Sequence, residues 1–116
     1  MKASLDISFY IGERGDNPVF EFLNSLNAKE IGKCLAYMHL LAEEGNSLPA
    51  NYIKHIDGDL WELRPEFGGQ EFRFFYFIVL SDTILFLHAF KKKTQKTSPT
   101  EIEIARKRME EVRPVA

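Results

Sequence analysis

Apolar residues recur along the chain with two different periods, and the change of period separates strands from helices. Residues 5–12 mix β-branched and aromatic side chains and end at a glycine, a pattern typical of a strand. Asn17 and Pro18 then suit the N-cap and first position of a helix. Asn27 offers a second N-cap, and residues 31–42 carry an apolar stripe at steps of three and four. This pattern predicts a strand followed by a helical hairpin.

The second half of the chain has strand patterns. Residues 52–56 and 60–64 are short runs around the turn signal Asp-Gly-Asp, which predicts a hairpin. Residues 65–69, Pro-Glu-Phe-Gly-Gly, are expected to break the chain. Residues 70–80 and 83–90 are almost continuously apolar, which favours central strands covered on both faces.

The last pattern is helical. Residues 97–113 begin with Thr-Ser-Pro, which suits a helix N-terminus, and then place their apolar residues on one side. The predicted fold class is therefore α+β, a single domain over residues 1–116. It has an N-terminal strand, a helical hairpin, a small and mostly antiparallel sheet, and a C-terminal helix.

Composition limits the function classes. The 116 residues are 45% hydrophobic and 28% charged, as in ordinary globular proteins, and the net charge is −2. Such a chain has no bulk attraction for nucleic acid, so binding of that kind has to come from a local patch. Residues 88–97 hold four lysines and no acidic residue, and they are the strongest such patch.

The sequence lacks the motifs of several classes of enzyme and metal-binding protein. The sequence contains no phosphate-binding glycine loop, no Cys-x-x-Cys and no His-Glu-x-x-His, and its three histidines are scattered. We therefore expect neither a metal nor a cofactor. Cys34 is the single cysteine, which excludes an intramolecular disulfide and favours a buried thiol. With no signal peptide and no apolar run of about 18 residues, we expect a cytoplasmic protein without membrane spans.

Strand alternation identifies one arginine inside an aromatic run. Arg73 has the opposite parity to Tyr76 in that strand, so the two face opposite sides unless a bulge intervenes. An unpaired buried guanidinium is costly. Arg73 can therefore pair with Glu62 or Glu71 as a structural contact, or act on a ligand together with Arg64. The residues leave both alternatives open.

The lysines follow the most apolar strand and its terminal His88. If that strand continues, alternation places Lys92 on the side of His88 and its two neighbours on the other side. Such a cluster is suited to phosphate groups, and solvent exposure at a strand end is the simpler alternative. The lysines that could contact phosphate are Lys54, Lys91, Lys92, Lys93 and Lys96.

Four segments together resemble a known family: NPVFEFLNSL, KHIDGDLWELR, EFRFFYF and LHAFKKKTQKTSPTEIEIARKR. In order and spacing they are similar to the HigB-like, phage-derived branch of the RelE/ParE toxin superfamily. The resemblance runs from Asn17 to Arg108, and the LWELR and HAFKKKTQKT segments are its most specific parts. It implies a RelE-like fold and the toxin of a type II toxin–antitoxin pair.

The resemblance also implies an activity and a partner. The implied activity is metal-independent cleavage of mRNA on the ribosome, in which the RNA 2′-hydroxyl attacks the adjacent phosphate and basic side chains stabilise the developing charge. The implied partner is an antitoxin, a small helix-turn-helix protein. The candidate catalytic residues are Arg64, Arg73, His88 and Lys92. The candidate substrate-binding residues are Tyr76, Lys91 and Lys93, which the resemblance implies, together with Lys54 and Lys96 from the basic residues described above. A ParE-like toxin acting on gyrase and a non-enzymatic nucleic-acid- or partner-binding domain are the alternatives.

Overall fold

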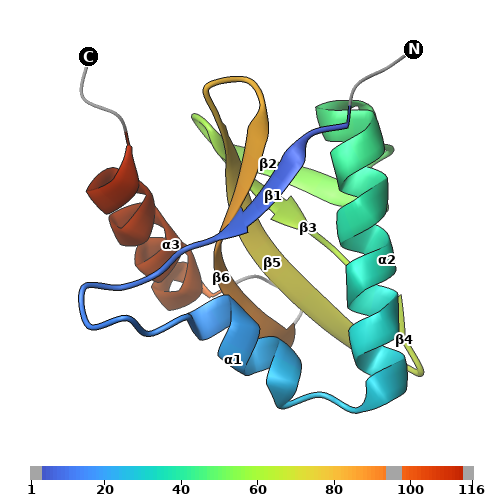
Figure 1. Ribbon diagram of the computed structural model, residues 1–116. Coiled ribbons are helices and arrows are strands. Elements are labelled where there is room, and N and C mark those ends of the chain that lie inside the picture. The colour runs from blue at the N-terminus through green and yellow to red at the C-terminus, as the bar shows by residue number, and fades with distance from the viewer. Residues whose placement is uncertain (1–3, 94–97, 114–116) are drawn as a thin grey trace.

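The computed structural model describes residues 4–93 and 98–113, which form a sheet with helices on both faces (Figure 1). No helix in this part of the chain is long and apolar enough to cross a membrane. The elements are β1 (Asp6–Phe9), α1 (Pro18–Asn24), α2 (Ala28–Glu44), the short 3-10 helix η1 (Gly45–Ser47), β2 (Ile53–Asp57), β3 (Leu60–Leu63), β4 (Glu66–Phe67), β5 (Gln70–Val79), β6 (Thr83–Lys92) and α3 (Pro99–Val112).

The sheet has the order β1-β6-β5-β3-β2, and β4 pairs with the first residues of β5. Only β1, beside β6, forms a parallel pair among the described strands. The expected α+β fold with a mostly antiparallel sheet is confirmed. The two most apolar strands, β5 and β6, are central, as their composition predicted.

Helices α1 and α2 cover one face of the sheet and α3 covers the other (Figure 1). Alternation along β5 divides its side chains between two cores. The core under α1 and α2 includes Val19, Cys34, Met38, Leu41, Phe72, Phe74, Tyr76 and Phe86. The core under α3 includes Tyr10, Leu60, Phe75, Phe77, Leu87, Ala105 and Met109.

The helix boundaries follow the predicted capping residues. The side chain of Asn17 accepts a hydrogen bond from the amide of Phe20, and Pro18 occupies the first helical position. Asn27 and Glu30 form a reciprocal capping box with distances of 2.9 and 3.0 Å. Gly45 ends α2 with φ of 62°, a conformation that favours glycine. The connection between α1 and α2 is only residues 25–27, so the short helical hairpin is confirmed.

Three features differ from the sequence prediction. β1 is shorter than residues 5–12, and β6 continues through two of the lysines. Residues 65–69, expected only to break the chain, contain β4 and a tight turn in which Gly68 and Gly69 have φ of 58° and 80°. Two consecutive positive φ angles suit a two-residue hairpin, so the glycines make a strand pair possible where an interruption was expected.

A bulge in β6 decides which residues face α3. Phe75 pairs with His88 and Tyr76 pairs with Phe86, so Leu87 is the extra residue between them. Leu87 packs in the core under α3, and His88 also contacts α3. From His88 onward, alternation puts Phe90 and Lys92 on the α3 side.

Candidate functional site

Charged side chains gather on the α3-side face of the sheet, beyond the apolar residues that α3 covers. Residues directly opposite each other in an antiparallel pair project to the same face. The register places Glu71 opposite Lys92, and Lys54 opposite Glu62. We call this group the charged strip; its members are Lys54, Glu62, Arg64, Glu71, Arg73 and Lys92.

Arg73 is the most deeply buried member of the charged strip, with 1% of its surface exposed. Its Nη2 donates to Oε1 of Glu71 at 2.8 Å, and its Nη1 donates to the carbonyl of Phe72 at 2.8 Å. Its Nε lies 3.6 Å from Oε1 of Glu62. The structural pairing that the sequence left open is thus present with both candidate carboxylates.

Glu62 lies between two guanidinium groups. It is 1% exposed, and its Oε1 is 3.6 Å from Nε of both Arg64 and Arg73. Neither Nε atom has a hydrogen-bond partner within the described structure, although both are buried. Arg64 differs from Arg73 because its side chain is 29% exposed. Of the two arginines, Arg64 is therefore the one that a ligand can reach.

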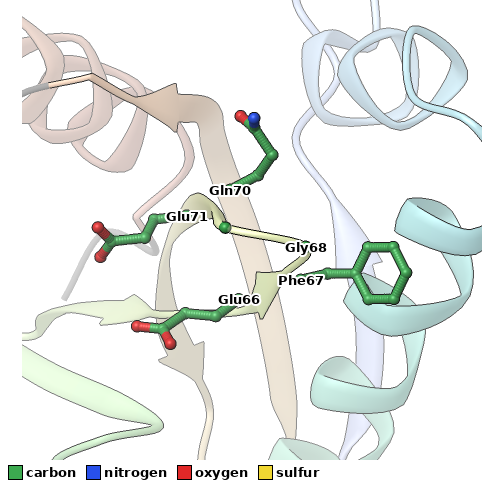
Figure 2. A pocket seen from close by; sticks show the side chains of 6 residues that line it. Glu66, Phe67, Gly68, Gln70 and Glu71 are labelled. Atoms are coloured by element: carbon green, nitrogen blue, oxygen red, sulfur yellow. The ribbon is translucent and has the colours of Figure 1, made fainter.

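Glu71 lies at the edge of the charged strip, in the hairpin formed by β4 and β5. Its cross-strand partner is Glu66, and the two carboxylates point to one side of the hairpin while Phe67 points to the other (Figure 2). The pKa of Glu71 is lowered, because Arg73 donates to its carboxylate and Lys92 lies nearby. The carboxylate therefore stays ionised, and its negative charge partly neutralises the guanidinium of Arg73.

His88 lies between the charged strip and α3, and its ring packs against the rings of both Phe75 and Phe90, which also contact each other. Its Nε2 is 3.2 Å from Oε2 of Glu101, and its Nδ1 is 3.3 Å from Nη1 of Arg108. Arginine can only donate, so we infer that Nδ1 accepts and that Nε2 carries the proton toward Glu101. Burial lowers the pKa of His88, and Arg108 lowers it further against the opposing effect of Glu101.

The lysines at the end of β6 point in different directions. Lys91 places its Nζ 5.9 Å from the ring of Phe72, on the side of α1 and α2. Lys92 shares the α3 side with His88, as alternation predicted, and is partly exposed. Lys93 is exposed after the end of the strand, and Lys96 lies outside the described residues.

The comparison with known families matches most of the chain. Residues 21–110 fit the model of a family described as Phage derived protein Gp49-like (DUF891). The chain belongs to this Gp49-like family. No curated protein matches the chain significantly. The match confirms the phage-derived, toxin-like family that the resemblance implied, while the narrower HigB assignment stays a prediction.

The residues of the Gp49-like match include the whole charged strip and Tyr76. Tyr76, however, lies outside the charged strip. Tyr76 is fully buried in the core under α1 and α2, and its hydroxyl donates to Oδ1 of Asn46 at 2.7 Å. Burial also raises the pKa of Tyr76. The bulge falls on β6 and leaves the alternation of β5 intact, so Tyr76 and Arg73 stay on opposite faces. We therefore leave Tyr76 out of the candidate site.

Two residues of the site come from α3 and were not singled out in the sequence. Glu101 and Arg108 are seven residues apart, which places them on one helix face two turns apart, and both reach His88. This spacing was available as a signal. Among the described residues of this Gp49-like chain, no three His, Cys, Asp or Glu side chains are grouped as metal ligands. The described side chains of the site present charged and hydrogen-bonding groups.

Proposed function

We propose that this Gp49-like protein is the toxin of a toxin–antitoxin pair and cleaves mRNA on the ribosome. The observation that supports the proposal best is the placement of accessible basic groups on one face of the sheet. Lys54, Arg64 and Lys92 lie on the α3 side and retain exposed surface. Their positive charges provide a local patch in a chain with net charge −2.

The members of the charged strip differ in solvent exposure, and we assign their roles accordingly. Arg64 and Lys92 are the members that we assign to the scissile phosphate, because they combine charge with access. Arg73 is held by two carboxylates and a carbonyl, so it acts as a positioning residue for Glu62 and Glu71. Lys54, Lys91 and Lys93 are exposed and are assigned to neighbouring phosphates.

The proposed reaction is an internal phosphoryl transfer. The ribose 2′-oxygen forms a bond to the adjacent phosphorus, the bond to the 5′-oxygen of the next nucleotide breaks, and a 2′,3′-cyclic phosphate remains. The proton leaving the 2′-hydroxyl is balanced by the proton that the departing 5′-oxygen receives. Arg64 and Lys92 would stabilise the extra negative charge on the phosphate during this exchange.

Proton transfer is assigned to the pair of His88 and Glu101. Both ring nitrogens of His88 are already engaged, so the histidine cannot accept a proton while Arg108 stays in place. The side chain of Glu101 is 25% exposed and is the accessible end of this pair. We propose that Glu101 receives the proton and that His88 positions its carboxylate.

Variants with translating ribosomes test this function. Purified protein is added to an in vitro translation reaction, and the 5′ ends of the mRNA are mapped. Arg64→Ala should lower the cleavage rate about 100-fold, equivalent to about 3 kcal/mol of transition-state stabilisation. Lys92→Ala should lower it more than Lys91→Ala, because Lys91 points to the other side of the sheet.

Lys107→Ala is the matched control, because Lys107 is an exposed lysine on α3 away from the charged strip. It should cleave like the unmodified protein. The assignment would be refuted if Lys91, Lys92 and Lys107 variants all cleaved at one rate, or if the unmodified protein left translated mRNA intact. If expression of the protein in cells arrested growth through DNA damage while mRNA stayed intact, gyrase would be the target instead.

The proposed partner is an antitoxin that covers the charged strip or the helical hairpin. If apolar burial dominates that contact, the complex should lose only modest affinity as salt rises. Co-purification with the product of a neighbouring reading frame, followed by a salt titration, measures this. Complete dissociation at moderate salt would show that charge alone holds the partner.

A further inference from the structure

A pocket, the hollow of Trp61, adjoins the charged strip at the edge of the sheet formed by β2 and β3. Its volume is about 510 Å³, within the range of small-molecule sites. Apolar lining comes from Leu48, Ile53 and Trp61, and polar lining includes Lys54, His55 and Arg64. None of the described residues that line it is acidic.

Trp61 supplies an aromatic surface in this hollow. Its side chain is partly exposed, and the ring of His55 lies 4.8 Å away, centroid to centroid, at an interplanar angle of 46°. Nε2 of His55 is 2.7 Å from the carbonyl oxygen of Gly58, which holds the imidazole beside the indole. Flat aromatic rings in this setting are suited to stacking against another planar group.

Two cations lie at the same hollow. Nη1 of Arg64 donates to the carbonyl of Ala50 at 3.1 Å, which directs the guanidinium toward the loop before β2. Lys54 is exposed on the edge strand β2, where alternation directs its side chain to the α3 side, whereas His55 and Trp61 project to the side of α1 and α2. Because Arg64 also lies 3.6 Å from Glu62, it connects the hollow to the charged strip.

The other hollow, at the hairpin of β4 and β5, has the opposite charge. It has a similar volume of about 490 Å³, and its charged lining consists of Glu66 and Glu71 (Figure 2). An anionic ligand is disfavoured there and favoured at the hollow of Trp61. Size does not separate the two hollows, so charge and aromatic surface decide which one accepts a nucleotide.

We propose that the hollow of Trp61 binds one nucleotide of single-stranded RNA. The base stacks on the indole on the side of α1 and α2, and Arg64 and Lys54 contact the phosphate where the RNA backbone passes around the edge strand β2 to the α3 side. Stacking on an aromatic side chain combined with cations along the backbone is the general way in which proteins hold single strands. The inference deepens the proposed function, on which it rests for the source of the RNA, by naming a nucleotide subsite beside the charged strip.

The sequence provides a direct probe, because Trp61 is the only tryptophan of the chain. Oligoadenylate is titrated into the purified protein without ribosomes, and the tryptophan emission is followed. We expect saturable quenching. Lys54→Ala should raise the apparent Kd several-fold and reduce the slope of log Kd against log salt by about one. Lys107→Ala should change neither quantity, and both lysines are exposed, so both variants should fold.

N-acetyltyrosinamide, a neutral aromatic probe, distinguishes a nucleotide site from a docking site for a protein side chain. It should quench far less than oligoadenylate at equal concentration. Equal quenching by the two probes, no quenching by oligoadenylate, or an unchanged Kd in Lys54→Ala would each overturn the inference. Because the titration contains no ribosome and no cleavage step, quenching without cleavage in the translation assay would refute the proposed function and leave the nucleotide subsite standing.

Discussion

Replacing Arg73 by methionine should destabilise the protein strongly. The substitution preserves much of the side-chain volume but removes the hydrogen bonds to Glu71 and to the Phe72 carbonyl. It also removes the guanidinium of Arg73 from beside Glu62, which is 1% exposed and lies 3.6 Å from Nε of Arg64. Removing one partner of a buried ion pair typically costs about 3–5 kcal/mol. Because Arg64 stays near Glu62, we expect the lower end, about 3 kcal/mol.

The double variant Glu62→Leu/Arg73→Met separates burial of charge from loss of packing. Replacement of both members of a buried pair by apolar residues is often close to neutral. Arg64 can then turn toward water, since its side chain is already 29% exposed. The double variant should therefore recover most of the stability that Arg73→Met loses.

Urea denaturation followed by circular dichroism measures the free energy of unfolding. A loss of about 3 kcal/mol corresponds to a fall in Tm of roughly 10 °C for a domain of this size. Lys92→Met is the matched control, because Lys92 lies on the same face but is partly exposed, and it should cost less than about 1 kcal/mol. A loss below about 1 kcal/mol in Arg73→Met, or a double variant at least as unstable as Arg73→Met, would refute this account of the buried pair.

Three further predictions concern single residues. Burial lowers the pKa of His88 below its unfolded value of about 6.5, so the unfolded chain binds more protons and stability should fall as pH decreases from about 6.5 toward the folded pKa. Urea denaturation at a series of pH values should show this loss in the unmodified protein and a smaller loss in His88→Gln; parallel profiles would contradict it. Asn27→Ala removes the capping box of α2 and should cost about 1 kcal/mol in the same assay, whereas an unchanged midpoint would show that the cap contributes nothing. Burial raises the pKa of the fully buried Cys34 to about 12, so iodoacetamide should modify the thiol only after urea unfolds the chain, and rapid modification of the native protein would contradict its burial.

Local chemistry made much of the fold predictable. Asn17, Asn27 and Gly45 specify helix ends through their own side chains or lack of one, and these boundaries needed no information from distant residues. The aromatic density of β5 and β6 identified the central strands for a similar reason. Apolar residues on both sides of a strand require cover on both sides, which the three helices supply.

The candidate site depended on contacts that the sequence does not display. The bulge at Leu87 leaves no mark in the apolar pattern, yet it sets the side on which His88 and Lys92 lie. Parity placed Arg73 and Tyr76 on opposite faces, but only the structure shows how deeply each is buried. Glu101 and Arg108 reach His88 because α3 crosses the sheet at that point, and helix packing of this kind is set by the whole core.

Mapping of mRNA 5′ ends after induced expression in cells tests the central claim most directly. The unmodified protein and Arg64→Ala are expressed without the antitoxin, at matched levels confirmed by immunoblot, and transcripts are sequenced from their 5′ ends. Cleavage on the ribosome predicts new 5′ ends inside translated coding regions with the unmodified protein, and far fewer with Arg64→Ala. Growth arrest with unchanged mRNA ends would contradict the proposal that the charged strip of this Gp49-like protein cleaves RNA.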